Sequence, residues 1–311
     1  MKKLLAILLA ITCIVSVAAC GNTNPPAADP TPTPDDVVVI DDPTEPEGVE
    51  DPETPAAPQG EFADLAILDI PLTDEEYAIG FRLNSDLVPV VDAAIALLMN
   101  DGTLAALAEK YGVADLLITG GALVDAVPFS LDTAASTVAD LAAITAAGKL
   151  VIGITEYEPM NYYDATGTLV GFDTEFAQAV CAILGVEAEF VVINWDTKEI
   201  ELAGKQIDCI WNGLTVTEPR RLNMDFSVSY LRNEQALVVK KNIAANYTDL
   251  ASLAGLTIVA EEGSAGETAA LEIDGINYVP VAAQSSAMLE VKAGTADAAI
   301  VDITMARELT K

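Results

Sequence analysis

Hydrophobic and polar residues alternate regularly from residue 132 to the end of the chain, and their spacing predicts an ordered series of helices and strands. In the first half of this region, apolar residues with helical spacing alternate with short apolar runs of the strand type. The expected helices are 133–147, 174–184 and a segment ending near 203, and the expected strands are 149–154, 188–193 and 207–211. This β-α-β-α-β order predicts a parallel sheet that binds ligands at the carboxyl ends of its strands.

The same alternation predicts a second β-α series in the remainder of the chain. The expected strands are 235–240, 256–260, 278–281 and 296–301, and helices are expected from near Glu267, over 285–292 and from Asp302. Before residue 132, the pattern predicts strands at 63–71 and 76–83, a helix capped at Ser85 and Asp86, a helix at 103–111, and an irregular connector at 116–130. The chain is therefore expected to have an α/β fold.

The segment 209–221 (C-I-W-N-G-L-T-V-T-E-P-R-R) predicts a strand that leads directly into a helix, with Thr217 as the N-cap. Gly213 allows a ligand to come close to the backbone, free N–H groups are expected near Thr215, and Arg220 adds a permanently charged fork. Together these groups would bind one carboxylate. The alternative is an ordinary β-turn-α connection whose arginine pairs with a surface acid.

The charge balance restricts the function. The 311 residues include 48 acidic residues, 15 basic residues and no histidine. Such a chain has no broad cationic face for a phosphate backbone, which argues against nucleic acid as a partner. The absence of histidine excludes His-based catalytic triads and argues against a zinc enzyme, and we expect neither a cofactor nor a metal.

Residues 1–20 have the order of an export signal, with two lysines, an apolar run and then small residues that end at Cys20. The run is too short for a stable spanning helix, and the small residues before Cys20 resemble a bacterial lipobox, in which the cysteine becomes the lipidated N-terminus. We therefore expect an extracytoplasmic protein that is anchored to the cell membrane by lipid. The alternative is a plain signal peptide that happens to contain a cysteine at its end.

Residues 21–60 contain ten prolines, ten acidic residues and no lysine or arginine. Such a segment cannot bury enough apolar surface to offset its ordering entropy, so we expect a disordered tether, or alternatively an acidic docking tail. The folded domain is then expected at 61–311 and contains Cys181 and Cys209. We expect two buried thiols, although an exported protein could also join them in a disulfide.

Four motifs in the folded part resemble a known family. They are G-F-D-T-E-F-A from Gly171, N-G-L-T-V-T-E-P-R from Asn212, G-S-A-G from Gly263 and A-D-A-A-I-V-D from Ala296. In this combination they are similar to the polar amino-acid binding proteins of bacterial ABC importers, and the resemblance extends over residues 63–311. It implies a two-lobed periplasmic-binding-protein fold of type II that closes on its ligand.

The resemblance also implies roles for single residues. Arg220, with Gly213 and Thr215, would hold the ligand α-carboxylate, and Asp302 would hold the α-ammonium unless it is only the N-cap of the last helix. Trp195 would cover the ligand side chain, and Ser264 would contact the carboxylate from the second lobe.

The side-chain pocket is less well defined by the sequence. Trp195, Tyr157 and Tyr162 suggest stacking on an aliphatic, sulfur-containing or cationic stem. Glu156 or Glu158 could pair with a basic ligand, or either could face water. A polar amino acid, with cystine as one candidate, is the expected ligand.

The order of the pieces differs from that of the family, because residues 63–111 resemble a segment that comes last in other members. The simplest account is a circular permutation, and the alternative is a fused or truncated gene. Lobe 1 is then expected at about 76–235, and lobe 2 at about 61–72 together with 237–311. The two crossings between these lobes would form a hinge.

We therefore predict a monomeric lipoprotein, not an enzyme, that captures a free amino acid and delivers it to the transmembrane subunits of an ABC permease. Two alternatives stay open. One is a sensor or scaffold module that binds the same ligand, and the other is an enzyme similar to prephenate or arogenate dehydratases, which would need an acid-base group beside the ligand.

Overall fold

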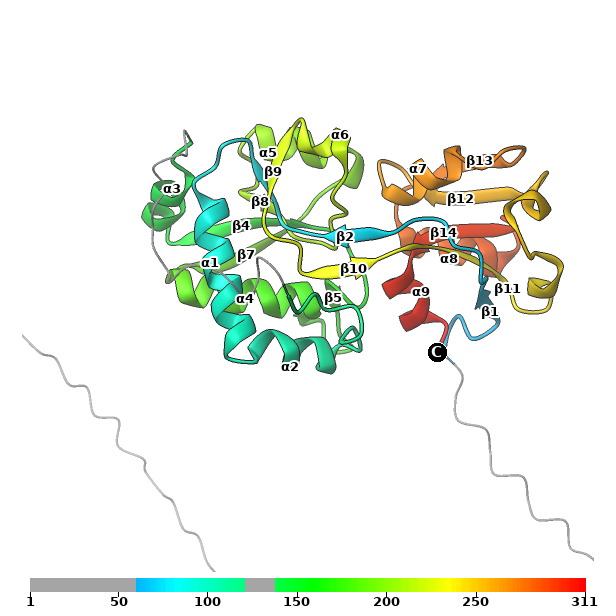
Figure 1. The fold of residues 1–311 in the computed structure, drawn as a ribbon, viewed down its shortest axis with the longest axis horizontal. Coiled ribbons are helices and arrows are strands. Elements are labelled where there is room, and N and C mark those ends of the chain that lie inside the picture. Colours follow the sequence, from blue (N-terminus) through cyan, green and yellow to red (C-terminus); the bar gives the residue numbers. More distant parts are fainter. Residues whose placement is uncertain (1–59, 121–137) are drawn as a thin grey trace, which may run out of the picture. The chain divides into compact units, whose positions relative to one another are not determined.

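A computed structural model describes residues 60–120 and 138–311, and by their contacts these residues belong to one unit (Figure 1). The predicted export signal with Cys20 and the predicted tether up to residue 59 lie outside the described residues. Residues 121–137, which include most of the predicted connector and the start of the predicted helix 133–147, lie outside them as well.

The first sheet is mixed and has five strands. Their order is β7 (Glu187–Val192), β4 (Lys149–Ile154), β8 (Cys209–Ile210), β3 (Gly80–Arg82) and β9 (Met224–Phe226). The predicted β-α-β-α-β series supplies β4, β7 and β8, which are parallel, whereas β3 runs antiparallel to both of its neighbours. Helices belonging to this part of the chain are α1 (Leu87–Asn100), α2 (Thr103–Lys110), α3 (Asp140–Ala147), α4 (Phe172–Leu184), α5 (Lys198–Ala203) and α6 (Glu218–Arg221).

The second sheet also has five strands. Their order is β1 (Leu65–Ile67), β11 (Gln235–Lys240), β14 (Ala298–Asp302), β12 (Thr257–Glu261) and β13 (Asn277–Val281). Strands β13, β12 and β14 are parallel, and β11 and β1 are added to them in antiparallel pairs. The helices here are α7 (Ala265–Leu271), α8 (Gln284–Ala293) and α9 (Ile303–Leu309).

Two segments that are far apart in the sequence run between the sheets. Strand β2 (Glu75–Tyr77) connects β1 to β3, strand β10 (Leu231–Asn233) connects β9 to β11, and the two pair antiparallel, with Tyr77 opposite Leu231 (Figure 1). The predicted strand 76–83 is therefore divided into β2 and β3. Another two-stranded sheet, β5 (Tyr162–Tyr163) with β6 (Leu169–Val170), lies in the loop between β4 and α4.

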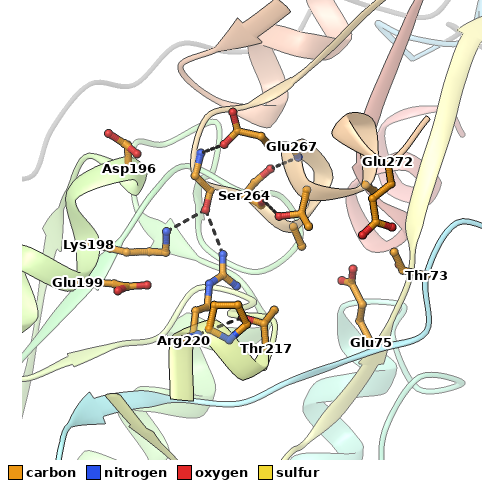
Figure 2. A pocket seen from close by; sticks show the side chains of 15 residues that line it. Thr73, Glu75, Asp196, Lys198, Glu199, Thr217, Arg220, Ser264, Glu267 and Glu272 are labelled. Atoms are coloured by element: carbon orange, nitrogen blue, oxygen red, sulfur yellow. Dashed lines mark hydrogen bonds between the residues drawn. The ribbon is translucent and has the colours of Figure 1, made fainter. Parts of the chain in front are cut away.

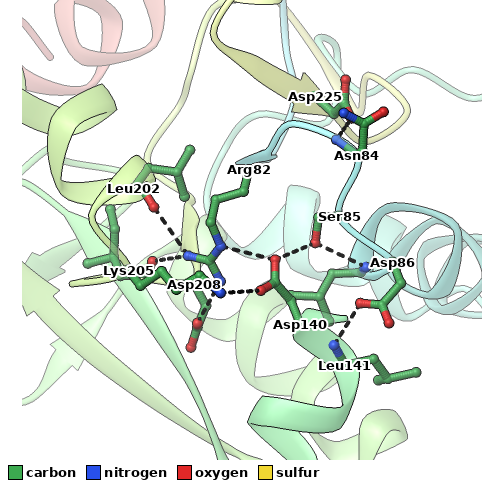
Figure 3. A network of polar contacts seen from close by, with 12 residues as sticks. Arg82, Asn84, Ser85, Asp86, Asp140, Leu141, Leu202, Lys205, Asp208 and Asp225 are labelled. Atoms are coloured by element: carbon green, nitrogen blue, oxygen red, sulfur yellow. Dashed lines mark hydrogen bonds and ion pairs between the residues drawn. The ribbon is translucent and has the colours of Figure 1, made fainter. Parts of the chain in front are cut away.

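A buried polar network joins the N-terminal part of the first sheet to elements that follow much later in the chain (Figure 3). From β3, Arg82 donates to Asp140 Oδ2 at 3.0 Å, to Asp208 Oδ1 at 3.0 Å and to the Ile207 oxygen at 2.6 Å. The Ser85 hydroxyl donates to the same Asp140 oxygen at 2.8 Å. Because a buried guanidinium needs its donors satisfied, this network fixes β3 against α3 and the start of β8.

The core of the first sheet is aromatic. Phe176 lies edge-on to Trp211 with a centroid distance of 4.9 Å, and edge-on to Tyr230 at 5.4 Å. Cys181 and Cys209 are buried free thiols, as expected. Asp173 lies in the first turn of α4, whose N-cap is Gly171, and its carboxylate accepts hydrogen bonds from Gly213 and Tyr230.

Within residues 60–120 and 138–311, no single helix has the length and hydropathy needed to cross a bilayer. Helices α1 and α2 meet that test only when they are taken together, and the chain bends by 77° between them.

Candidate functional site

A cavity of about 510 Å³ is lined by residues that follow strands of both sheets and by the crossing segment at β2 (Figure 2). Arg220 and Lys198 come from the first sheet's helices α6 and α5, Ser264 is the N-cap of α7, and Glu75 belongs to β2. The other lining residues are Thr73, Asp196, Glu199, Thr217, Pro219, Gly263, Ala265, Glu267, Thr268, Ala269 and Glu272. Of the predicted site residues, the structure places Arg220 and Ser264 in this wall.

Local structure brings Arg220 into the cavity wall. Thr217 caps α6 by accepting a hydrogen bond from the Arg220 N–H at 3.3 Å, and proline occupies the first turn. The guanidinium is buried and donates to the Thr215 oxygen at 2.7 Å and to the Gly263 oxygen at 3.1 Å. Burial lowers the pKa of Arg220 from its ordinary value, and it forms no ion pair with any described residue.

Lys198 was not singled out from the sequence. It is the first residue of α5, and its ammonium donates to the Trp195 oxygen at 2.9 Å and to the Gly263 oxygen at 3.0 Å. The nitrogen lies 4.7 Å from the centroid of the Trp195 ring, so Trp195 packs beneath this cation. The available sequence signal was a lysine three residues after Trp195, the predicted aromatic ligand contact.

Asp302 lies at the end of β14, and its carboxylate accepts hydrogen bonds from three side-chain amides. Oδ1 accepts from Asn233 at 2.6 Å and from Gln235 at 2.7 Å, and Oδ2 accepts from Gln284 at 2.5 Å. Asp302 is at the N-cap position of α9, but its carboxylate makes no capping hydrogen bond to that helix, so capping does not account for the side chain. Burial and the nearby Glu75 raise the pKa of Asp302 to about 6. Asp302 is buried behind the cavity wall rather than in it.

Glu75 is the second residue that sequence reasoning missed. Its Oε2 accepts hydrogen bonds from the Thr215 hydroxyl at 3.1 Å, from Asn233 at 2.9 Å and from Gln235 at 3.0 Å. Glu75 thus connects Thr215 to the amides that hold Asp302, and it faces the cavity. The available sequence signal was the run of acids Asp74, Glu75 and Glu76 in one of the two crossings that are predicted to form the hinge.

Gly213 differs from its expected role. Its N–H donates to Asp173 at 2.6 Å instead of facing a ligand, and its φ of +57° would be unusual for other residues. A side chain at this position would meet the ring of Tyr157 at 2.6 Å and the ring of Tyr77 at 3.1 Å. The glycine therefore admits two tyrosine rings to the backbone.

Tyr157 links elements that cover different sheets. Its hydroxyl is 2.7 Å from that of Tyr77 and also contacts the hydroxyl of Thr304 in α9. Both tyrosines are buried, with 2% and 0% of their surface exposed for Tyr157 and Tyr77. This chain of hydroxyls connects the loop after β4, the crossing segment and the last helix.

Glu156 is exposed and lines a second cavity, of about 310 Å³. Tyr157, Glu158 and Tyr162 line this cavity as well, and its other wall includes residues of α8 and α9. Neither Glu156 nor Glu158 lines the cavity that holds Arg220. The acids in the walls of the larger cavity are Glu75, Asp196, Glu199, Glu267 and Glu272.

The charges in the larger cavity are separated. Lys198 and Arg220 both lie on one side, together with the acids Asp196 and Glu199, and only acids, Glu75 and Glu272, are labelled on the other side (Figure 2). Glu267 is already engaged, since it accepts from the Gly263 N–H at 2.8 Å. Such a cavity is suited to a ligand that carries a negative and a positive group. Within the part of the chain that the structure describes, no group of acidic or cysteine side chains is arranged to hold a metal.

Comparison with known proteins places the chain in a family. The model of bacterial extracellular solute-binding proteins, family 3, matches residues 150–271. The lysine/arginine/ornithine-binding periplasmic protein of Escherichia coli K12 is 31% identical over 181 residues, which are 57% of this chain and 68% of that protein. The chain therefore belongs to the bacterial extracellular solute-binding proteins of family 3, as the sequence motifs predicted.

Among individual relatives, the L-cystine-binding protein TcyJ of Escherichia coli K12 is 38% identical over 97 residues. That match covers 30% of this chain and 36% of the relative, so the chain spans well under half the length of this protein. The relatives bind different amino acids according to their names, and identity alone does not choose among them.

Solved structures share the fold. The arginine-bound form of truncated ArgBP from T. maritima has 33% identity and a TM-score of 0.52, with 54% of this chain and 79% of that chain covered. The ancestral amino acid-binding protein AncCDT-1, a precursor of cyclohexadienyl dehydratase, has 30% identity and a TM-score of 0.52, with coverage of 53% and 74%. The predicted two-lobed α/β fold is thus confirmed.

Proposed function

We propose that this protein binds a free polar amino acid between its two lobes and delivers it to the transmembrane subunits of an ABC importer. The observation that carries the proposal is the buried guanidinium of Arg220, which lines a cavity and has no acidic partner among the described residues. An unpaired buried cation is unfavourable without a ligand anion, and an α-carboxylate supplies one.

The α-ammonium of the ligand would bind on the opposite side of the cavity. Glu75 faces the cavity, and Asp302 lies directly behind it, joined to Glu75 through the amides of Asn233 and Gln235. Two neighbouring carboxylates favour a cation, and each charge-assisted hydrogen bond contributes about 1.5 to 3 kcal/mol. We therefore assign carboxylate binding to Arg220 with Ser264, and ammonium binding to Glu75 supported by Asp302.

Trp195, Thr215 and Tyr157 would shape this site without forming its charged contacts. Trp195 packs under the ammonium of Lys198. The main-chain oxygen of Thr215 accepts a hydrogen bond from Arg220, and its hydroxyl donates one to Glu75. The hydroxyl of Tyr157 contacts Thr304 and so joins the two lobes. Gly213 supports Tyr157, and Glu156 contributes to the second cavity.

We further propose an extracytoplasmic, monomeric lipoprotein that is anchored through Cys20, with residues 21–60 as a tether. The names of the relatives support the location outside the cytoplasm, since they are periplasmic or extracellular proteins. A circular permutation, with lobe 1 at about 76–235 and lobe 2 formed by 61–72 and 237–311, is supported by β3 inside the first sheet and β1 at the edge of the second.

The test is a thermal-shift screen of the purified chain against the twenty amino acids, cystine, ornithine and prephenate. A ligand that binds only the native state raises the melting temperature by mass action. A rise with one or a few amino acids supports the proposal, and transport by a reconstituted permease then separates delivery from sensing. A cooperative melt with no shift for any amino acid would contradict it.

A further inference from the structure

The environment of Lys198 is unusual for a lysine. Only 3% of its surface is exposed, and among the residues that the structure describes its ammonium donates only to the main-chain oxygens of Trp195 and Gly263. Within residues 60–120 and 138–311 it forms no ion pair. A lysine is seldom buried without an anionic partner, because its charged form loses hydration that main-chain oxygens replace only in part.

Lys198 and Arg220 converge on a single atom. The ammonium of Lys198 is 3.0 Å, and a guanidinium nitrogen of Arg220 3.1 Å, from the oxygen of Gly263 (Figure 2). Both cations also lie against the Trp195 ring, at 4.7 Å for Lys198 and 6.0 Å for Arg220 from the ring centroid. One neutral carbonyl oxygen is thus placed where two positive charges meet, at the wall of the cavity.

The charged groups around Lys198 do not neutralise it by direct contact. Besides Arg220 on α6, they are Asp196 in the turn before α5, Glu199 on α5 and Glu261 on β12. Glu199 accepts a hydrogen bond from Asn223 at 2.8 Å. Burial and Asp302 raise the pKa of Glu261 to about 8, so this group is largely uncharged at neutral pH. A free anionic group is therefore the missing partner of both cations.

We propose that Lys198 and Arg220 together bind the carboxylate of the ligand, and that Lys198 takes up a proton as the ligand binds. This inference rests on the proposed function and adds a second carboxylate-binding residue to it. The carboxylate oxygens replace the Gly263 oxygen as acceptors for both cations. A carboxylate with two oxygens can satisfy both donors at once, which a single carbonyl oxygen does less well.

The direction of the proton transfer follows from the environment. Burial and the neighbouring Arg220 lower the pKa of Lys198 to about 7 in the free protein. A bound carboxylate favours the charged ammonium and raises that pKa, so the complex holds more protons than the free protein above about pH 7. Affinity therefore falls as the pH rises above about 7, by at most about tenfold per pH unit.

The experiment is isothermal titration of the purified chain with L-arginine, L-lysine, L-histidine and L-cystine at pH 6.5 and pH 8.0, in two buffers with different ionisation enthalpies. The variants are Lys198→Met, Lys198→Arg and, as a control at an exposed lysine, Lys241→Met. The ligand itself gains or loses the same protons when it binds to Lys198→Arg and to the unchanged chain. The difference in proton uptake between these two proteins therefore reports on Lys198. Glu261→Gln removes the other group that titrates nearby.

In the unchanged chain, we expect binding to take up a fraction of a proton at pH 8.0 and to weaken several-fold between pH 6.5 and 8.0. Lys198→Arg should bind at both pH values without this uptake, and Lys198→Met should bind at least tenfold more weakly at pH 6.5. Equal affinity of Lys198→Met and the unchanged chain would overturn the carboxylate role. Equal proton uptake in Lys198→Arg and the unchanged chain would overturn the proton linkage.

A melting curve of each variant separates folding from binding. Lys198→Met removes an unpaired buried charge, so the melting temperature of this variant without ligand should not fall. If Lys198→Met does not fold, Lys198→Arg still tests whether proton uptake is linked to binding. If the unchanged chain binds none of these four amino acids and none of those in the thermal-shift screen, the proposed function fails and this inference fails with it. Binding that is insensitive to Lys198 would overturn this inference alone.

Discussion

The carboxylates of Glu75 and Asp302 accept hydrogen bonds from the same two side-chain amides, those of Asn233 and Gln235. The strand β2 supplies Glu75, and the last strand, β14, supplies Asp302, so two residues far apart in the chain form one negatively charged group. Their repulsion contributes to the raised pKa of Asp302. A ligand cation would relieve that repulsion, so removing one of the two carboxylates tests whether they are coupled.

Glu75→Gln should lower the pKa of Asp302, because it removes a neighbouring negative charge. It should also weaken binding of the amino acid about tenfold, because Glu75 is the carboxylate of this pair that lines the cavity. Carbon-13 NMR titration of the Asp302 carboxyl and calorimetry measure the two effects. Glu272→Gln is the matched control, because Glu272 lines the same cavity but is exposed. An unchanged pKa of Asp302 in Glu75→Gln would contradict the coupling.

Arg220→Ala should weaken binding about 30-fold or more, as expected when one partner of a buried charge pair is truncated. Arg220→Lys keeps the charge but loses the fork that reaches both Thr215 and Gly263, so an intermediate loss is expected. Calorimetry gives the affinities, and circular dichroism checks the fold. If Arg220→Ala retained full affinity, the carboxylate would have to bind elsewhere.

Tyr157→Phe and Thr304→Val should each lower the free energy of unfolding by about 1 kcal/mol, because each removes a buried hydroxyl contact between the loop after β4 and α9. The double variant should cost less than the sum, since both changes remove the same contact. Urea unfolding measures these values. Tyr278→Phe serves as a control, because its hydroxyl contacts Glu267 within the second lobe. Strict additivity would indicate that the two hydroxyls act independently.

Gly213→Ala should destabilise the protein by about 2 to 4 kcal/mol, because it combines an unfavourable positive φ with a collision against the Tyr157 ring. Gly167→Ala isolates the first of these effects. Its φ of +79° is also positive, but no atom lies within 4 Å of the added carbon, so about 1 kcal/mol is expected. Equal melting temperatures for the two variants would show that Tyr157 moves away without cost.

Asp173 predicts a pH dependence of stability. Burial raises the pKa of this carboxyl to about 7, more than the hydrogen bonds from Gly213 and Tyr230 lower it. Between about pH 4 and pH 7, the folded protein holds a proton that the unfolded chain releases, so stability falls as the pH rises through this window. The slope from this group is at most about 1.4 kcal/mol per pH unit.

Urea unfolding at pH 5, 6, 7 and 8 measures this slope, and Asp173→Asn should remove its contribution. Asp302 adds a slope of the same sign up to about pH 6, so Asp302→Asn separates the second group. Asp164→Asn, in an exposed turn, should leave the slope from Asp173 intact. A pH slope that Asp173→Asn does not change would assign the effect to another group.

The sequence predicted elements best where the periodicity of a single continuous segment defines its type and its ends. The helix α4 and the strands β4 and β11 follow from periodicity within a few residues of their bounds. The division of 76–83 into β2 and β3 could not be predicted, because it depends on distant partners. The Ala78 N–H donates to the Leu214 oxygen, and the Ile79 N–H donates to Ser227.

The same limit applies to the site. Motifs identified Arg220 and Ser264, which line one cavity, because their chemistry depends on a local strand-to-helix turn. In the sequence, nothing distinguishes Lys198 and Glu75 from charged residues on the surface. Only tertiary contacts place them at the cavity. The partner of Lys198, Gly263, is 65 residues away, and the partners of Glu75 are more than 130 residues away.

The pairing of β1 with β11 affects how the chain folds during synthesis. Leu65 pairs with Lys240, so β1 leaves the ribosome 175 residues before its partner, or roughly 10 to 35 s earlier at ordinary elongation rates. We expect β1 to wait unpaired while the first sheet forms, which exposes a hydrophobic strand to chaperones or aggregation. Proteolysis of chains arrested before residue 230 should cut near β1, whereas protection there would show an earlier partner.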